Sequence, residues 1–446
     1  MVLMQEVFGM GADVSSPSYV NRGKLDERFK NALSSRRHIA IHGGSKQGKS
    51  WLREKGLDDN AAIILQCVPA STAESLLRQA LGRLGVQAKL KRTTSQEFEG
   101  KLDFTGAGEL GKWIAKAKAE GTVSAAASRG TDTEYEPIGQ SPADLSWVAT
   151  TIAASGKRLI LEDFHYLSER VQKDLAFLLK AMGEYGLYVI VVGVWPKDHL
   201  LTYYNGDLDG RVEDIHLKWN DDELATVVRQ GCDALRIRIP DPIIAELVKE
   251  ASGSVGLVQR LAEQLCRAEG VDKATSSWSM PPTIGTRDSL DAAKRAVAEQ
   301  MEGRFQTFAD NFVRGMRRLP EGLEVYKFLL QAATDASDEE LTEGIDSAAL
   351  LAAIAEHGGH LIRASDLTQA LDRIDRLQVK IEVSPPVLTY GKASRRLFLA
   401  DRAFLFFRRN GEPRWPWMSG EPEITNDLSA GNPLIIDEDD TAQVNP

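Results

Sequence analysis

The sequence predicts an α/β fold in which a parallel β-sheet is covered by helices and is followed by a helical lid and a second small domain. Three observations support this prediction. Short apolar runs alternate with helix-like segments up to about residue 220, which is typical of a parallel sheet buried on both faces. The strand pattern then stops, and three helices with short connections follow. Beyond residue 287, several helices precede a strand–turn–strand pattern.

The strands of the sheet are predicted from compact apolar runs flanked by turn residues. These runs are residues 38–42, 61–67, 158–161, 187–194 and 215–217. The segments between them carry apolar residues at helical spacing. They predict helices at residues 72–84, 145–154 and 170–182, with a further helix at 26–33 before the first strand.

The lid and the last domain are predicted from helical spacing alone. Lid helices are expected at residues 221–235, 241–251 and 256–268. Asp221 and Asp241 stand where N-caps belong, and Pro242 follows at the first helical position. Helices at 289–316, 322–333, 347–357 and 364–377 then precede strands at 387–390 and 395–400. This order is typical of a winged helix.

The predicted organisation is a leader, a sheet domain with one insertion, the lid, the winged-helix domain and a tail. The corresponding residues are 1–17, 18–220 with the insertion at 93–141, 221–278, 287–418 and 419–446. The insertion is predicted from its weak pattern and its small, polar residues. The tail is acidic and has no Lys or Arg after Arg414, so we expect it to be solvated.

Composition limits the possible classes of function. The chain has 446 residues and a net charge of −10, which excludes general electrostatic attraction to nucleic acid, so any DNA contact needs a local basic patch. Cys67, Cys232 and Cys266 are far apart and lack CxxC spacing, which argues against disulfides and structural zinc. No apolar run has the ~18 residues of a membrane span. We therefore expect a cytoplasmic protein that does not contact a membrane.

A phosphate-binding loop is predicted between the first strand and the next helix. The residues Gly43, Gly44, Ser45, Lys46, Gln47, Gly48, Lys49 and Ser50 match GxxxxGK[ST] at every fixed position. The glycines let the backbone N–H groups turn toward phosphates, and the helix that follows adds its positive end. We expect Lys49 to reach the β- and γ-phosphates and Ser50 to bind Mg²⁺.

A metal-binding carboxylate is expected at the end of a neighbouring buried strand. Glu162 and Asp163 end the strand at 158–161. Two assignments are open. Glu162 faces Mg²⁺ while Asp163 polarises the attacking water, or Asp163 is the metal-side acid and no general base follows it.

Three further residues are candidates with a competing structural interpretation. His165 either orients water or senses the γ-phosphate, or it is a hydrogen-bonded structural histidine, which we favour. Arg211 precedes the last strand and could reach the γ-phosphate of a neighbouring subunit, or it forms a surface ion pair. Arg260 lies early on a lid helix that could fold over the phosphates, or it faces solvent.

In this order, the motifs resemble those of the AAA+/STAND group of P-loop ATPases, in particular archaeal-type and origin-recognition-type ATPases. Residues 19–22, with Leu25 and Phe29, resemble the segment that precedes the P-loop and lines the adenine pocket there. Residues 161–167 (LEDFHYL) resemble the group's apolar strand ending in Asp-Glu, with the two acids swapped. Residues 388–406 resemble the winged-helix end of archaeal-type ATPases.

The resemblance covers most of residues 18–410. It implies ATP and Mg²⁺ as ligands, ATP hydrolysis, and assembly as a homo-oligomer or with a protein partner. It aligns Arg211 with the group's post-strand arginine and Arg260 with its lid arginine. The group's polar sensor residue after the fourth strand has no counterpart, because Gly193-Val194-Trp195 stands there, which implies slow turnover.

A basic run near the C-terminus leaves DNA binding open. Between residues 392 and 414, seven Lys and Arg residues stand against two acids and are interleaved with phenylalanines. Such a wing can grip phosphates. The helix at 364–377, however, carries Asp366, Asp372 and Asp375, which makes it a poor reader of DNA. We favour a winged helix that contacts protein or inhibits its own chain.

Two hypotheses of function follow. In the first, ATP and ADP favour different placements of the lid and winged helix on the P-loop domain, and this switch controls assembly or partner recruitment, as in signalling or defence ATPases. In the second, the chain is a DNA-binding AAA+ ATPase of the initiator or transposition-regulator type.

Overall fold

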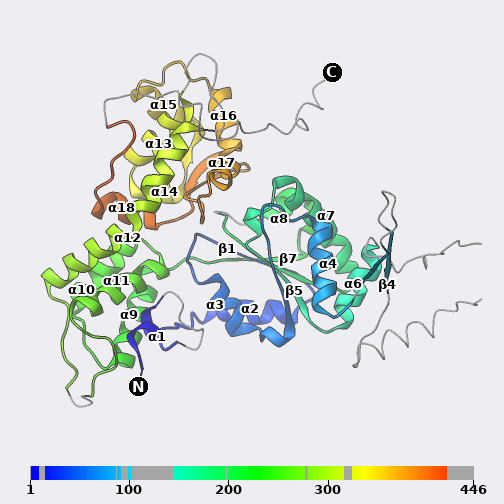
Figure 1. Ribbon diagram of the computed structural model, residues 1–446, viewed down its shortest axis with the longest axis horizontal. Coiled ribbons are helices and arrows are strands. Elements are labelled where there is room, and N and C mark those ends of the chain that lie inside the picture. Colours follow the sequence, from blue (N-terminus) through cyan, green and yellow to red (C-terminus); the bar gives the residue numbers. More distant parts are fainter. Residues whose placement is uncertain are drawn as a thin grey trace, which may run out of the picture.

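The computed structural model (Figure 1) describes residues 2–9, 16–86, 144–195, 199–276, 280–315 and 324–418, together with the backbone of 88–91 and 99–102. The last two segments are β3 Ala88–Lys91 and β4 Glu99–Leu102, which pair antiparallel. Most of the predicted insertion at 93–141 and the predicted acidic tail at 419–446 lie outside the described residues. Among those that are described, no helix is both long and apolar enough to cross a lipid bilayer.

Five parallel strands form the central sheet, in the order β2-β5-β6-β1-β7. Their bounds are β1 His38–His42, β2 Ala62–Gln66, β5 Arg158–Glu162, β6 Val189–Val192 and β7 Val212–His216. The predicted parallel sheet is confirmed, and each predicted strand is shifted by at most a few residues. Since β1 lies between β6 and β7, the loop that follows β1 emerges between the ends of these two strands at the sheet's carboxyl edge.

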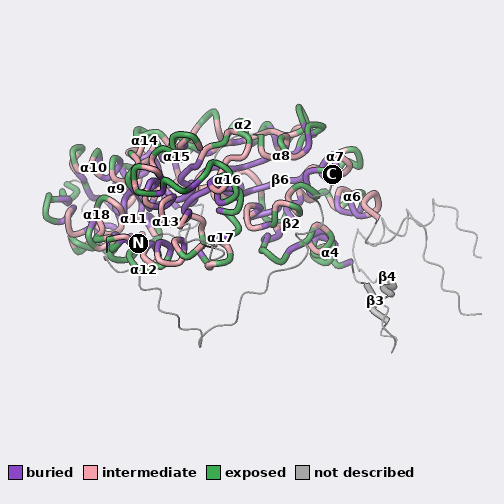
Figure 2. The backbone as a smooth tube through the Cα atoms, turned by 90° about the horizontal axis from the view of Figure 1, so that it is seen from above, coloured by how far each residue is buried: buried purple, intermediate pink, exposed green. Residues whose placement is uncertain are grey.

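Helices cover both faces of this sheet because its strands are apolar on both sides. On one face lie α2 Lys24–Ser34 and α3 Lys49–Gly56; on the other lie α4 Ala73–Arg83, α6 Leu145–Ala154, α7 Glu169–Glu184 and α8 Leu200–Tyr204. The short 3₁₀ turns η1 Asp59–Ala61, η2 Phe164–Tyr166 and η3 Gly206–Leu208 connect them. In Figure 2 the tube of β6 runs through the buried interior between these layers.

The three lid helices are confirmed as α9 Asp221–Leu235, α10 Asp241–Ala251 and α11 Val255–Ala268. Their predicted N-caps were wrong by one residue. Asn220 caps α9, since its side chain accepts from the N–H of Glu223, and Pro240 occupies the N-cap position of α10. Asp221 and Asp241 instead stand in the first turn, where an acid is stabilised by the positive end of the helix.

The N-terminal leader contains a helix that the sequence pattern did not reveal. α1 Met4–Phe8 packs against α9 and α11. Met4, Val7 and Phe8 are buried, and Phe8 lies so close to Gly231 that a Cβ on this glycine would clash with its ring. A helix of about one turn is too short to show a periodic apolar pattern in the sequence. The helix α1 is therefore recognisable only from its packing against the lid.

The C-terminal unit begins with the long helix α12 Arg287–Arg314. It continues with α13 Val325–Asp335, α14 Asp338–Glu343, β8 Ile345–Asp346, α15 Ser347–Glu356, α16 Ala364–Asp372, α17 Ile374–Lys380, β9 Leu388–Gly391, β10 Arg396–Leu399 and α18 Ala403–Asn410. The three strands form an antiparallel sheet in the order β8-β10-β9. This arrangement is compatible with the winged helix that the sequence predicts, which remains an interpretation.

Two details of this unit differ from the prediction. The helix expected at 364–377 is broken at Arg373 into α16 and α17, and the sequence pattern missed α14 and β8. The two strand residues of β8 are recognisable only through their pairing with β10, where Ile345 lies opposite Leu397.

One continuous hydrophobic core joins α1, the lid and the C-terminal unit. The helix α12 connects the two parts of this core, because α12 packs against α11 of the lid and against α13 and α18 of the C-terminal unit. Figure 1 shows α10, α11, α12 and α18 side by side, apart from the central sheet. The buried residues of the sheet belong to two separate clusters, one on each face.

Candidate nucleotide site

The predicted phosphate loop lies at the carboxyl edge of the sheet, between β1 and α3. Gly43 and Gly48 have positive φ values of 141° and 79°, which favour glycine. At Gly43 a Cβ would also lie 2.7 Å from the carbonyl oxygen of Leu217. The two fixed glycines of the motif are therefore explained by backbone geometry. α3 starts at Lys49, so its positive end faces the loop.

A cavity of about 370 Å³ opens over this loop. The loop itself supplies residues 45–50 to the wall. The rest of the wall comes from the segment before α2, from η2, from the lid and from the C-terminal unit. These lining residues include Tyr19, Arg22, Asp163, His165, Tyr166, Trp219, Gly256, Gln259 and Pro385. Parts of the chain that are distant in sequence thus meet at one site.

Lys49 is held inside this cavity by its own loop. Its Nζ donates to the carbonyl oxygen of Gly44 at 2.7 Å. Burial lowers the pKa of Lys49 to about 8, although Asp163 and Glu162 nearby oppose the shift. An ammonium group that is buried with so little compensation gains free energy when an anion arrives.

The two acids at the end of β5 have different surroundings. Glu162 is 5% exposed, does not line the cavity, and accepts a hydrogen bond from Nε of the buried Arg53 at 3.1 Å. Asp163 does line the cavity and adopts a left-handed backbone conformation, with φ 57°. Burial raises the pKa of Asp163, and Lys49 opposes this rise. Of the two, only Asp163 lines the cavity.

His165 also lines the cavity, in the turn after β5. Its Nδ1 accepts the backbone N–H of Val194, just beyond β6, at 3.2 Å. The hydrogen-bonded structural interpretation is therefore correct for one ring nitrogen. Burial, with a contribution from Lys49, lowers the pKa of His165 to about 3, so the ring is neutral near pH 7.

The two candidate arginines lie away from this cavity. Arg211 is at the amino end of β7, where its carbonyl pairs with His38, and its side chain is 3.9 Å from Glu184. It therefore stands at the opposite edge of the sheet from the P-loop. Arg260 donates to Gln300 of α12 at 2.7 and 3.0 Å. The lid residues on the cavity are Val255, Gly256 and Gln259 instead.

The segment before α2 also lines the cavity, where it contributes Ser18, Tyr19, Val20 and Arg22. Arg22 lies over the ring of Trp219 with its guanidinium carbon 4.2 Å from the ring centroid. Tyr19 stacks on Trp51, and its hydroxyl donates to Asp26. Flat apolar rings with few polar groups suit a nucleobase.

Sequence reasoning missed that the C-terminal unit reaches the P-loop itself. The carbonyl oxygen of Ala400, just after β10, accepts the N–H of Ser45 at 2.8 Å. Tyr166 of η2 shares a hydrogen bond with Ser384, and Lys392 donates to Glu169 of α7 at 2.5 Å. No local pattern encodes these contacts, because they join residues more than 200 positions apart, as Ser45 and Ala400 illustrate.

The basic run at 392–414 is largely committed to contacts within the chain. Lys392, Arg396, Arg402, Arg408 and Arg409 each donate to an acid or a carbonyl oxygen of another segment. The interleaved phenylalanines 398, 404, 406 and 407 are buried. The pattern that left DNA binding open is thus explained by packing and by internal hydrogen bonds.

Comparison with solved structures supports the same fold. The Walker-type ATPase of Pyrococcus abyssi superposes with a TM-score of 0.54 at 14% identity, covering 90% of this chain and 99% of that one. The chain has the fold of a P-loop ATPase. The Orc1 protein of Aeropyrum pernix in complex with DNA (12% identity, 91% and 95% covered, TM-score 0.39) and the RuvB branch migration motor of Thermotoga maritima (13%, 86% and 94%, 0.33) are too different to add to this.

No protein-family model and no curated protein matches the sequence.

The residues of this P-loop ATPase fold suit Mg²⁺. Ser50, Asp163 and the buried Lys49 all line the cavity. Hydroxyl and carboxylate oxygens are the protein donors that Mg²⁺ accepts beside phosphate oxygens and water.

Proposed function

We propose that the chain binds ATP with Mg²⁺, hydrolyses it slowly, and acts as a switch in which the bound nucleotide controls assembly or partner recruitment. The resemblance to AAA+/STAND ATPases and the P-loop ATPase fold support the nucleotide part. The hydrogen bond from the P-loop N–H of Ser45 to the carbonyl of Ala400 supports the switch.

The residues at the cavity provide the chemistry of an ATPase. The loop N–H groups and the start of α3 bind phosphate oxygens, and Lys49 neutralises the β- and γ-phosphates. Ser50 and Asp163 would hold Mg²⁺, which when bound offsets the charge that develops on the phosphates. The Arg53–Glu162 pair leaves Glu162 unable to act as a free base, which supports slow turnover.

The contact between Ser45 and Ala400 couples the site to the C-terminal unit. In a P-loop the backbone N–H groups are the phosphate ligands. Here the C-terminal unit supplies a carbonyl oxygen to one of them, and Gly44 is so close to this carbonyl that a Cβ would lie 3.2 Å from it. A phosphate that draws this part of the loop toward itself therefore disturbs the docking of the C-terminal unit.

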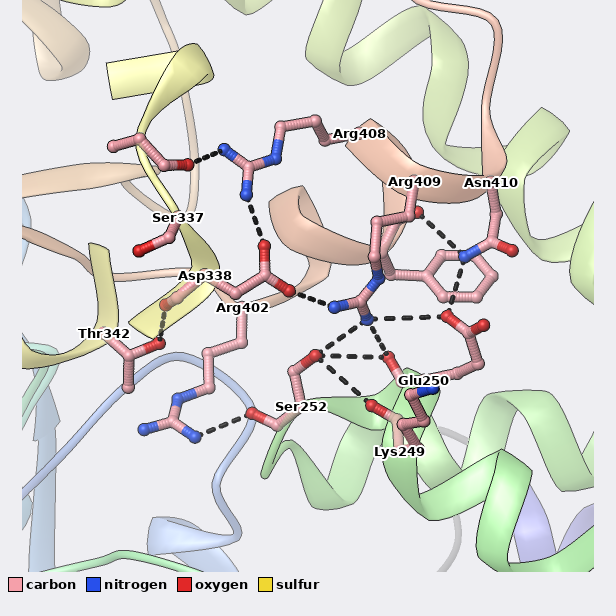
Figure 3. Close-up of polar contacts among 12 residues, drawn as sticks. Lys249, Glu250, Ser252, Ser337, Asp338, Thr342, Arg402, Arg408, Arg409 and Asn410 are labelled. Carbon is pink, nitrogen blue, oxygen red and sulfur yellow. Dashed lines mark hydrogen bonds and ion pairs between the residues drawn. The ribbon is translucent and has the colours of Figure 1, made fainter. Parts of the chain in front are cut away.

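The lid and the C-terminal unit should move together. They share one hydrophobic core, and a polar rim reinforces the joint (Figure 3). In this rim Arg409 and Asn410 of α18 bond to Glu250 of α10, Arg402 donates to the carbonyl of Ser252, and Arg409 also pairs with Asp338 of α14. The weaker joint is the one with the sheet domain, which rests on a few polar contacts.

Energy transfer between two dyes tests this proposal. Cys67, Cys232 and Cys266 are buried, so cysteines introduced at exposed positions can be labelled selectively. We expect transfer between Phe177→Cys on α7 and Leu361→Cys in the C-terminal unit to change on adding ATP and Mg²⁺. Transfer between Ala245→Cys on α10 and Leu361→Cys should stay constant. No change in the first pair at saturating ATP would overturn the switch.

We propose two further roles for arginines: Arg211 reaches the γ-phosphate of a neighbouring subunit, and Arg260 of the lid reaches the phosphates. Because Arg211 lies across the sheet from its own P-loop, it can serve only the site of a neighbouring subunit, which requires a homo-oligomer. Arg260 would have to exchange Gln300 for a phosphate, which requires α11 to rotate over the loop. Concentration-dependent ATP turnover that is lost in Arg211→Ala would support the first role.

DNA binding is the weaker alternative, because the basic run is largely committed inside the chain. Phosphate release measured with and without duplex DNA, beside Lys49→Ala as the blank, separates the two functions. Release that is Lys49-dependent and indifferent to DNA supports the switch. Release that rises several-fold with DNA, with binding that weakens steeply with salt, supports the initiator type.

A further inference from the structure

We propose that His165 contacts the terminal phosphate of ATP through its Nε2–H group and so distinguishes ATP from ADP. This inference rests on the proposed nucleotide site and deepens it. It concerns the position where the sequence lacks the polar residue that follows the fourth strand in the similar ATPases.

The geometry of the ring fixes which nitrogen is the donor. Nδ1 accepts the N–H of Val194 at 3.2 Å, so the neutral imidazole carries its proton on Nε2. Among the described residues, Nε2 is buried and has no hydrogen-bond partner. A buried donor without a partner costs about 1–3 kcal/mol, so such groups are paired in nearly all proteins. We infer that a ligand atom supplies this partner, after a shift of the ring that exposes the buried Nε2 to the cavity.

The position of the ring indicates what that ligand atom is. His165 lines the same cavity as Lys49, Ser50 and Asp163, and it follows Asp163 by two residues in the turn after β5. In a P-loop this lysine reaches the β- and γ-phosphates. The oxygen that reaches Nε2 therefore belongs to the terminal end of the phosphate chain.

Val194 explains how the chain dispenses with a polar side chain at the end of β6. Val194 itself has no side-chain donor, and Gly193 leaves no room for one, since a Cβ there would lie 2.6 Å from the Trp195 ring. The backbone N–H of Val194 instead holds His165, which comes from the neighbouring strand. The Nε2–H donor thus comes from the turn after β5, and the backbone N–H of Val194 after β6 orients its ring.

The same turn also touches the C-terminal unit. Tyr166, next to His165 in η2, shares a hydrogen bond with Ser384, and the two rings of the turn lie 4.2 Å apart. A shift of His165 toward a phosphate therefore acts on one of the contacts that hold the C-terminal unit on the sheet domain.

A matched pair of substitutions tests the proposal. Asn in place of His165 keeps an acceptor near the Nδ1 position for Val194 but has no group at Nε2, whereas Gln places an amide N–H near Nε2. Affinities for ADP and for the non-hydrolysable triphosphate AMPPNP are measured by displacement of a fluorescent ADP analogue. We expect His165→Asn to bind ADP within about twofold of the parent protein and AMPPNP about 5–10-fold more weakly. His165→Gln should recover most of this loss.

Equal weakening of both nucleotides in His165→Asn, or no change in either, would overturn the proposal and leave His165 as a structural residue. The result is separate from the switch. If affinity depends on His165 but the dye pair on α7 and the C-terminal unit does not respond, the switch fails and this inference stands. If the parent protein binds no nucleotide, both are overturned.

Discussion

At the scale of single residues, the site stores unfavourable electrostatics that a nucleotide would relieve. Lys49 is buried and donates to the neutral carbonyl of Gly44, and within the part of the chain that the structure describes the buried Nε2 of His165 has no hydrogen-bond partner. Glu162, by contrast, is neutralised by Arg53. The surroundings, rather than the residue types, therefore decide which groups are available to a ligand.

The lowered pKa of Lys49 predicts how nucleotide binding depends on pH. The ammonium loses its proton near pH 8 in the ligand-free protein, and ATP binding needs it charged. We expect ATP affinity to be constant below about pH 8 and to fall about tenfold per pH unit above it. Titration calorimetry between pH 6.5 and 9.5 measures this. Lys49→Arg, whose guanidinium stays charged, is the control and should show a flat profile.

The same shift has a consequence for folding stability. A folded-state pKa below the unfolded value of 10.5 means that the unfolded chain holds more protons between pH 8 and 10.5. The contribution of Lys49 to stability is therefore unfavourable at neutral pH and improves as the pH rises through this window. Ligand-free Lys49→Met should lack this contribution, and its unfolding midpoint should be at least as high as that of the parent protein.

The two acids at the end of β5 predict opposite outcomes for two similar substitutions. Asp163→Asn removes the carboxylate on the cavity, so we expect ATP turnover to fall at least 100-fold. Glu162→Gln alters an acid that faces Arg53, so turnover should stay within a few-fold while the unfolding temperature falls, because Arg53 loses a charged partner. Steady-state phosphate release and thermal unfolding measure the two effects. The reverse order would show that Glu162 is the catalytic acid.

At the scale of elements, helix ends and loops position the site, while helix interiors form the cores. The P-loop lies where β1 ends and α3 begins, Asp163 and His165 lie just after β5, and Val194 lies after β6. Parallel strands bring all these ends to one edge of the sheet. The short α1 lies outside this arrangement, and its residues Met4, Val7 and Phe8 belong to the core that the lid shares with the C-terminal unit.

The packing of α1 predicts a large loss of stability from one substitution. Phe8 of α1 is fully buried, and its ring packs against Gly231 of α9. Phe8→Ala should therefore lower the free energy of unfolding by about 3–5 kcal/mol. Leu3→Ala is the control, because Leu3 precedes the same helix and is exposed. Urea-induced unfolding, monitored through the transition of the lid, measures the free energy of unfolding of both variants. A small effect of Phe8→Ala would mean that α1 does not contribute to the lid core.

At the scale of the whole molecule, the distribution of hydrophobic cores indicates what can move. The sheet domain has its own two cores, and a third core joins α1, the lid and the C-terminal unit. Motion that separates bodies with distinct cores costs little buried apolar area, whereas motion within one core costs much. The joint at the P-loop is therefore the hinge that the structure favours.

The polar rim in Figure 3 predicts a charge-specific effect on the other joint. Arg409→Glu places an acid between Glu250 and Asp338, so we expect α18 to separate from α10 and the unfolding temperature to fall by a few degrees. Arg414→Glu changes the net charge equally at an exposed position and should have little effect. Differential scanning calorimetry compares the two. Equal effects would indicate a general response to charge rather than loss of this rim.

The sequence by itself determined the elements whose signals are local. The P-loop, all five parallel strands and the three lid helices were predicted from apolar period and glycine placement, since these depend on neighbours a few residues away. Residues 43–50 could be assigned to phosphate for the same reason.

Only the tertiary structure decided which side chains meet at the site. It separated Asp163 from Glu162 through Arg53, placed Arg211 and Arg260 away from the cavity, and brought Ala400 to Ser45. It also showed that basic residues of the run at 392–414, which the sequence left as a candidate DNA surface, form hydrogen bonds within the chain. Such contacts join residues far apart in the chain, and their free energies depend on burial and exact approach, neither of which a local pattern carries.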